Sequence, residues 1–125
     1  MSARKILGMI ALASAVAFGS AAATAQGYPT KPIRLVVPFG PGGSNDIIGR
    51  IVGQKLSENV GQPVIIDNRP GAGGMIGTDS VVNSAPDGYT LMIGATSTIA
   101  VNVGLYPKRG FDPVKSLTPI TQIAS

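Results

Sequence analysis

A glycine-rich segment at residues 40–46, GPGGSND, combines residue types that can bind an anion. It follows the apolar run Ile33–Val37 and precedes apolar residues with helical spacing, so the sequence predicts a strand, a tight loop and a helix start. The first N–H groups of a helix lack intrahelical partners, that end is partly positive, and glycines let a ligand approach. Such a loop suits phosphate, sulfate or carboxylate. The alternative is an ordinary connection in which Ser44, Asn45 or Asp46 caps the helix.

Two further segments of small residues repeat this pattern. Residues 68–74, NRPGAGG, follow a predicted strand at 64–67, and residues 94–98, GATST, follow a predicted strand at 89–93. In a parallel sheet all three loops lie at the carboxyl edge, where ligands bind in open α/β folds. A ligand site and a purely structural role both remain open from these loops alone.

The elements that would position the loops form the series βαβαβ(α)β. Helices are predicted from Ser44 to the C-terminal glycine Gly61, near residues 75–84 and at 99–103. Right-handed crossovers would then give an α/β fold, a parallel sheet with helices on its faces. The apolar positions predicted to make the first helix amphipathic are Ile47, Ile48, Ile51, Val52, Leu56 and Val60. Residues 106–113 are expected to be irregular, and a fourth strand is expected within 116–124.

Composition and missing motifs exclude several classes of function. The chain has no cysteine and no histidine, so thiolate metal sites, thiol nucleophiles and the commonest general base are absent from it. The G-x-G-x-x-G dinucleotide pattern fails because its third glycine would fall on Asn45 or Ile76, and no G-K-S/T or G-x-S-x-G string occurs. Asp46 and Asp67 are better explained by a helix start and a strand end than as catalytic carboxylates. We therefore expect no enzyme activity, no metal and no cofactor.

The N-terminal residues 1–25 have the three parts of a secretory signal. Arg4 and Lys5 precede an apolar core at 6–18, and the A-T-A of residues 23–25 is a cleavage pattern. The core is shorter than the roughly 20 apolar residues of a membrane span, so we expect export and cleavage. Without Arg4 and Lys5 the formal charge falls from +4 to +2, and the remaining basic residues are scattered, so nucleic-acid binding is not expected.

Long motifs in this chain resemble one family. Residues 28–50, YPTKPIRLVVPFGPGGSNDIIGR, are similar to the opening of the Bug or TctC family, the periplasmic solute-binding proteins of tripartite tricarboxylate transporters. The resemblance continues in order through residues 61–77, 85–91, 105–108 and 111–120, so it covers nearly all of the expected mature chain.

The resemblance implies a type II-like periplasmic-binding-protein fold, the two-domain Venus flytrap. Residues 26–125 would supply the first βαβαβ part of domain one and approach the crossover to the second domain near 117–125, in a chain cut from something longer. A small carboxylate, such as a dicarboxylate, a tricarboxylate, an acidic amino acid or an aromatic acid, would be held largely by backbone amides and ordered water. A periplasmic, monomeric protein would deliver it to membrane permease subunits. The alternatives are a ligand-sensing partner of a sensor kinase and, less favoured, an exported enzyme.

The resemblance also implies which residues contact the ligand. Phe39 would pack against it, the first loop would donate amides or a hydroxyl, and Asp46 would fix the loop or bond a polar ligand group. Met75 stands where the family often has asparagine, which would favour a more apolar ligand at that point. The implied ligand-binding residues are Phe39, Gly42, Gly43, Ser44, Asn45, Asp46, Gly71, Ala72, Gly73, Gly74, Met75, Ala95, Ser97 and Thr98.

Overall fold

The computed structural model describes residues 27–107 and 110–124, and the predicted signal peptide at residues 1–25 lies outside these ranges. In chain order the elements are β1 (Ile33–Val37), α2 (Ser44–Val60), β2 (Val64–Asn68), a 3₁₀ turn (Ala72–Gly74), α3 (Met75–Val82), β3 (Thr90–Met92), a π-helical turn (Ser97–Val101), α4 (Asn102–Leu105) and α5 (Pro113–Ser116). Within the described part, no helix is long and apolar enough to cross a membrane.

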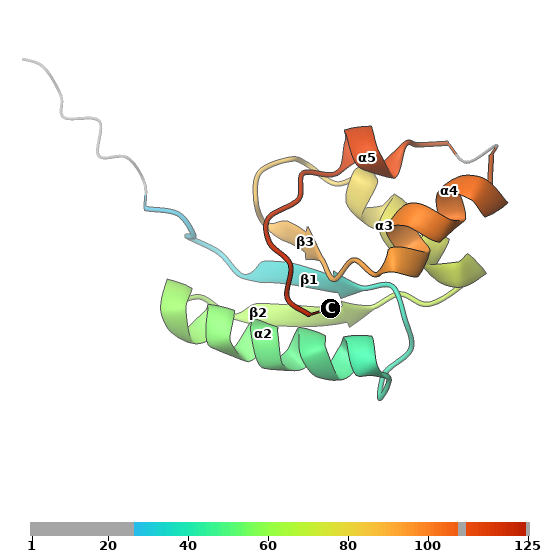
Figure 1. The fold of residues 1–125 in the computed structure, drawn as a ribbon. Coiled ribbons are helices and arrows are strands. Elements are labelled where there is room, and N and C mark those ends of the chain that lie inside the picture. The colour runs from blue at the N-terminus through green and yellow to red at the C-terminus, as the bar shows by residue number, and fades with distance from the viewer. Residues whose placement is uncertain (1–26, 108–109, 125) are drawn as a thin grey trace, which may run out of the picture.

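The three strands form a parallel sheet in the order β2-β1-β3. The near-continuous apolar run of β1 places it at the centre, where Val36 and Val37 are fully buried. The chain moves from β1 to β2 on one side and then crosses back to β3 on the other. Right-handed crossovers in these two directions put α2 and α3 on opposite faces of the sheet, as Figure 1 shows. The predicted α/β arrangement is confirmed, and the carboxyl ends of all three strands meet at one edge.

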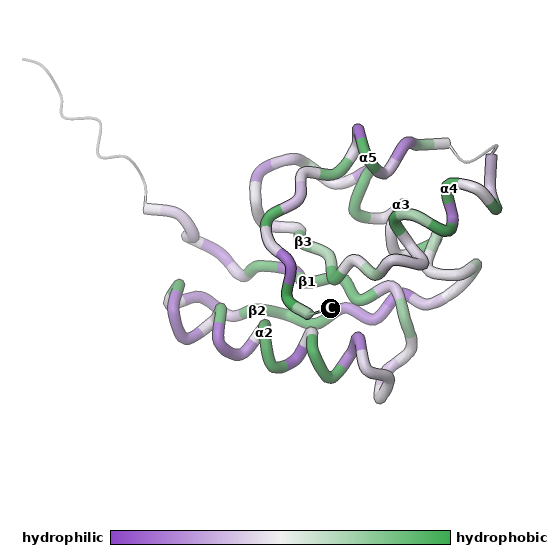
Figure 2. The backbone as a smooth tube through the Cα atoms, in the orientation of Figure 1, coloured by the Kyte–Doolittle hydropathy of each residue, from purple (hydrophilic) through white to green (hydrophobic). Residues whose placement is uncertain are grey.

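Helix α2 packs on the sheet through glycines, which the apolar periodicity did not indicate. Two of the residues predicted for the inner face, Ile47 and Ile51, are 52% and 60% exposed. A Cβ atom on Gly49 would lie 2.9 Å from Val37 Cγ2. One on Gly53 would lie 2.9 Å from Ile66 Cδ1. The missing side chains let the helix approach the strands closely, and this turns part of its hydrophobic surface outward. In Figure 2 hydrophobic residues accordingly recur along the whole length of α2.

One cluster of the buried core lies between α2 and the sheet. It consists of Leu35, Val37 and Ile93, with Phe39, Val64, Ile66 and Leu91 packed against them. Phe39 leads into the first glycine loop and is itself partly buried, so its ring contributes to the fold as well as lying at the expected site. The core therefore anchors the loop at the end where β1 finishes.

The C-terminal part of the described chain differs from the prediction. The expected fourth strand within 116–124 is wrong: Ser116 ends the short helix α5, and residues 117–124 form no strand. Asp112 starts α5 by accepting a hydrogen bond from the Val114 amide at 3.0 Å, with Pro113 in the first turn. An apolar run forms a strand only where it pairs with another, and Pro119 in this run has no N–H to donate.

Candidate anion-binding loops

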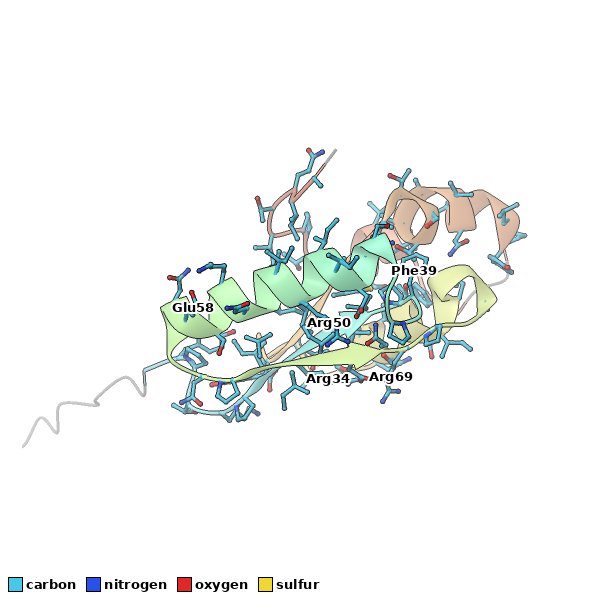
Figure 3. All side chains as sticks on the ribbon, turned by 90° about the horizontal axis from the view of Figure 1, so that it is seen from below. Arg34, Phe39, Arg50, Glu58 and Arg69 are labelled. Carbon is cyan, nitrogen blue, oxygen red and sulfur yellow. The ribbon has the colours of Figure 1, made fainter. Side chains whose placement is uncertain are left out.

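The N-cap of α2 is Gly43, and none of the three residues expected to cap the helix occupies that position. The first intrahelical hydrogen bond runs from the Ile47 amide to the Gly43 carbonyl at 3.0 Å, so the amides of residues 44–46 precede it. Gly43 has an extended backbone, with φ −79° and ψ 167°, and contributes no side-chain cap. In Figure 3 Phe39 lies beside this end of the helix. The amides at the start of α2 are therefore available to an anion, because no N-cap side chain occupies them.

Asp46 is buried, with 3% of its surface exposed, and its carboxylate is directed back into the protein. Its Oδ2 accepts hydrogen bonds from the Gly42 amide at 2.8 Å and from Arg50 Nε at 3.0 Å. Its Oδ1 accepts one from Asn68 Nδ2 at 2.9 Å. These contacts support the first of the two roles expected for Asp46, which was to fix the loop.

The hydrogen bonds on Asp46 lower its pKa. The Arg50 guanidinium, the Gly42 amide and the Asn68 amide, in that order of effect, outweigh burial and take the pKa of the carboxyl from 3.8 to about 2. A carboxyl with a lowered pKa in the folded state adds stability above its unfolded pKa, and this contribution is lost as the pH falls through the folded value. The ionised form of Asp46 therefore supports the loop throughout the neutral range.

We expect the effect of Asp46→Asn on stability to depend on pH. In urea unfolding of the full-length protein, the difference in unfolding free energy between wild type and variant should be the same at about pH 7 and pH 5 and smaller at about pH 3. The reason is that Asp46 of the unfolded chain takes up a proton near its ordinary pKa of 3.8, whereas Asp46 of the folded protein stays ionised until about pH 2. A difference that stayed the same down to about pH 3 would mean that the pKa is not lowered.

The second loop has an unusual backbone. Four successive residues, Gly71, Ala72, Gly73 and Gly74, have positive φ values of 128°, 47°, 64° and 90°. Glycine adopts these angles at little cost, whereas Ala72 does so with strain. The loop closes with a hydrogen bond from the Gly74 amide to the Gly71 carbonyl at 2.9 Å, and α3 begins at the next residue. The second loop therefore also has the predicted pattern of small residues that lead into the start of a helix.

The third loop packs directly on the second. Thr98 is buried, and its hydroxyl donates to the Ala95 carbonyl at 2.8 Å and accepts from the Ala95 amide at 3.0 Å. A Cβ atom on Gly74 would lie only 2.4 Å from Thr98 Cγ2. Asn102, in the same helical stretch as Thr98, donates from Nδ2 to the Gly73 carbonyl at 3.0 Å. The hydroxyl of Thr98 is thus used within its own loop, whereas Ser97 is exposed.

Side chains outside the predicted set hold the loops together. Asn68 donates from Nδ2 to the Phe39 carbonyl at 3.2 Å in addition to its bond to Asp46. The next residue, Arg69, donates its amide to the Val37 carbonyl at 2.9 Å. Asn68 and Asn102 were missed by sequence reasoning. For Asn68, the available signal was a polar residue at the carboxyl end of a predicted parallel strand.

Met75 lies in a different setting from the other predicted site residues. It is half-buried and lines an open pocket of about 300 Å³ together with Ile76, Asp79, Gly110 and Phe111. None of the other predicted site residues lines this pocket. The structure therefore places the three predicted loops at one sheet edge, whereas Met75 borders a pocket that it shares with Gly110 and Phe111.

Comparison with known proteins identifies a family for this chain. The sequence model described as the tripartite tricarboxylate transporter family receptor, TctC, matches residues 48–125. Protein BugT of Bordetella pertussis is 40% identical over 124 residues, covering 98% of this chain and 38% of BugT. The chain thus spans little more than a third of this relative.

Two solved structures from Rhodopseudomonas palustris superimpose on the chain. MatC with bound malate is 38% identical, with a TM-score of 0.70 over 74% of this chain and 31% of that one. A protein solved with adipate is 41% identical, with a TM-score of 0.67 over 70% of this chain and 29% of that one. The expected periplasmic-binding-protein fold is confirmed. On these matches the chain belongs to the TctC family, the receptors of tripartite tricarboxylate transporters.

Proposed function

We propose that the full-length protein is a periplasmic solute-binding protein that captures a small carboxylate for a tripartite tricarboxylate transporter. The observation that carries the proposal is the start of α2, where Gly43 leaves the amides of residues 44–46 without a side-chain cap. This end of the helix attracts negative charge. The malate and adipate of the two similar structures are both dicarboxylates, which fits such a site.

One carboxylate of the ligand would bind between the first and second loops. The amides of Ser44, Asn45 and Asp46 would donate from one side, with the exposed loop residues Gly71, Ala72 and Gly73 on the other. The side chain of Asp46 would act indirectly, because hydrogen bonds from Gly42, Arg50 and Asn68 already occupy its carboxylate. Ser97 and Ala95 would complete this half of the site. The protein would work as an exported monomer without a cofactor and pass its ligand to permease subunits.

A thermal-shift screen of the full-length mature protein tests this function. The panel contains malate, adipate, a tricarboxylate, acidic amino acids and aromatic acids, and each has a neutral amide analogue as its control. Because a ligand that binds only the folded state raises apparent stability, we expect a shift with at least one carboxylate and none with its amide. Sugars and cations are screened alongside the panel, and a shift with one of these but with no carboxylate would contradict the proposal.

A further inference from the structure

Asn68, the last residue of β2, joins the two ends of the first loop. Its Nδ2 donates to the Phe39 carbonyl at 3.2 Å and to Asp46 Oδ1 at 2.9 Å. Its Oδ1 accepts from Arg50 Nη2 at 3.4 Å. Phe39 stands at the beginning of the loop and Asp46 at its end, so one side chain on a neighbouring strand bridges the whole segment.

The bridge continues from Asp46 to the middle of the loop. The carboxylate that accepts from Asn68 also accepts from the Gly42 amide at 2.8 Å, and Gly42 has a φ of 85°. A segment containing three glycines has many accessible conformations, and ordering it on ligand binding would weaken affinity. The contacts from Phe39 through Asn68 and Asp46 to Gly42 select one conformation before the ligand arrives.

Asn68 also stands where the second loop leaves the sheet. The amide of Arg69 still bonds to the Val37 carbonyl of β1, and the positive-φ run starts two residues later at Gly71. A side chain at this point therefore fixes the first loop relative to the origin of the second. Asn68 does so without adding charge, while Arg50 offsets the negative charge of Asp46 beside an anion site.

We propose that Asn68, acting through Asp46, is a positioning residue that holds the first glycine loop in its ligand-binding conformation. The predicted effect of Asn68 on ligand affinity rests on the proposed function. The predicted effect of Asn68 on the order of the loop does not rest on that function, so the two effects can be tested separately.

The experiment uses the full-length mature protein with Asn68→Ala, Asn68→Asp and the control Asn59→Ala, which changes an exposed residue near the end of α2. Amide hydrogen exchange is measured over residues 39–47 and, as an internal reference, over β1. Malate binding is measured by titration calorimetry. Asn68→Ala should speed exchange over 39–47 several-fold while β1 stays unchanged, and should weaken malate binding about tenfold. Asn68→Asp should weaken binding further, because it places a second carboxylate against Asp46.

Two hydrogen-exchange results for Asn68→Ala would overturn the positioning role. One is unchanged exchange over residues 39–47 in Asn68→Ala. The other is an equal increase over β1, which would indicate general destabilisation. An effect of Asn59→Ala as large as that of Asn68→Ala would also contradict the proposal. If wild-type protein bound neither malate nor any other carboxylate, the proposed function would fail, while the exchange comparison would still decide the role of Asn68.

Discussion

Gly77→Ala is expected to lower the free energy of unfolding of the full-length protein by about 3 kcal/mol. Gly77 lies in α3 at the point where this helix crosses the end of β1. An added Cβ would lie 2.7 Å from Pro38 Cβ and 2.8 Å from both Pro38 Cα and the Arg69 carbonyl oxygen. Pro38 is buried and rigid, and the carbonyl belongs to the backbone, so none of these atoms can move aside cheaply.

Urea unfolding measures this effect, and Gly104→Ala in α4 is the matched control. A Cβ on Gly104 meets no atom within 4 Å, so this change should leave stability within about 1 kcal/mol of wild type. Because α3 begins directly after the second glycine loop, Gly77→Ala should also weaken carboxylate binding. If Gly77→Ala were as stable as wild type, α3 would not approach β1 as closely as it does in the structure.

The sheet and its loops could be predicted because their signals are local. The apolar run of β1, the glycine at 61 and the turn residues before β3 each indicate an element without reference to distant parts of the chain. Once the series of strands and helices is known, the handedness of the crossovers places all three loops at one edge. The same reasoning identifies the carboxyl edge of the sheet as the candidate ligand site.

The remaining features depend on packing distances, which a periodic pattern does not contain. Ile47 and Ile51 follow helical spacing, yet the close contact at Gly49 and Gly53 turns them outward. Ser44, Asn45 and Asp46 are all good capping residues, so their types did not indicate that Gly43 takes the N-cap position. The bridging role of Asn68 required knowing which loop lies beside the end of β2.

The N-cap of α2 offers the most direct test of the anion site. Gly43→Asp is expected to weaken binding of the carboxylate identified by the thermal-shift screen at least a hundredfold, or about 2.7 kcal/mol. The backbone of Gly43 is extended, and an added Cβ there would meet only the Gly40 carbonyl oxygen at 3.7 Å, so the side chain fits. Aspartate is also a favoured N-cap, hence the unfolding free energy should not fall. The new carboxylate would accept the amide hydrogen bonds at the start of α2 and repel the ligand's charge.

Gly43→Asn and Gly43→Ala separate the two causes of this loss. Asparagine has nearly the same shape and also caps a helix, but it carries no charge, so it should weaken binding only about tenfold by competing for the amides. Alanine neither caps the helix nor repels the ligand, so the Gly43→Ala variant should bind the ligand nearly as well as wild type. Equal losses from aspartate and asparagine would mean that occupation of the amides, and not charge, determines affinity. If Gly43→Asp bound the carboxylate with wild-type affinity, the start of α2 would not be part of the binding site, because no anion could share those amides with a fixed carboxylate.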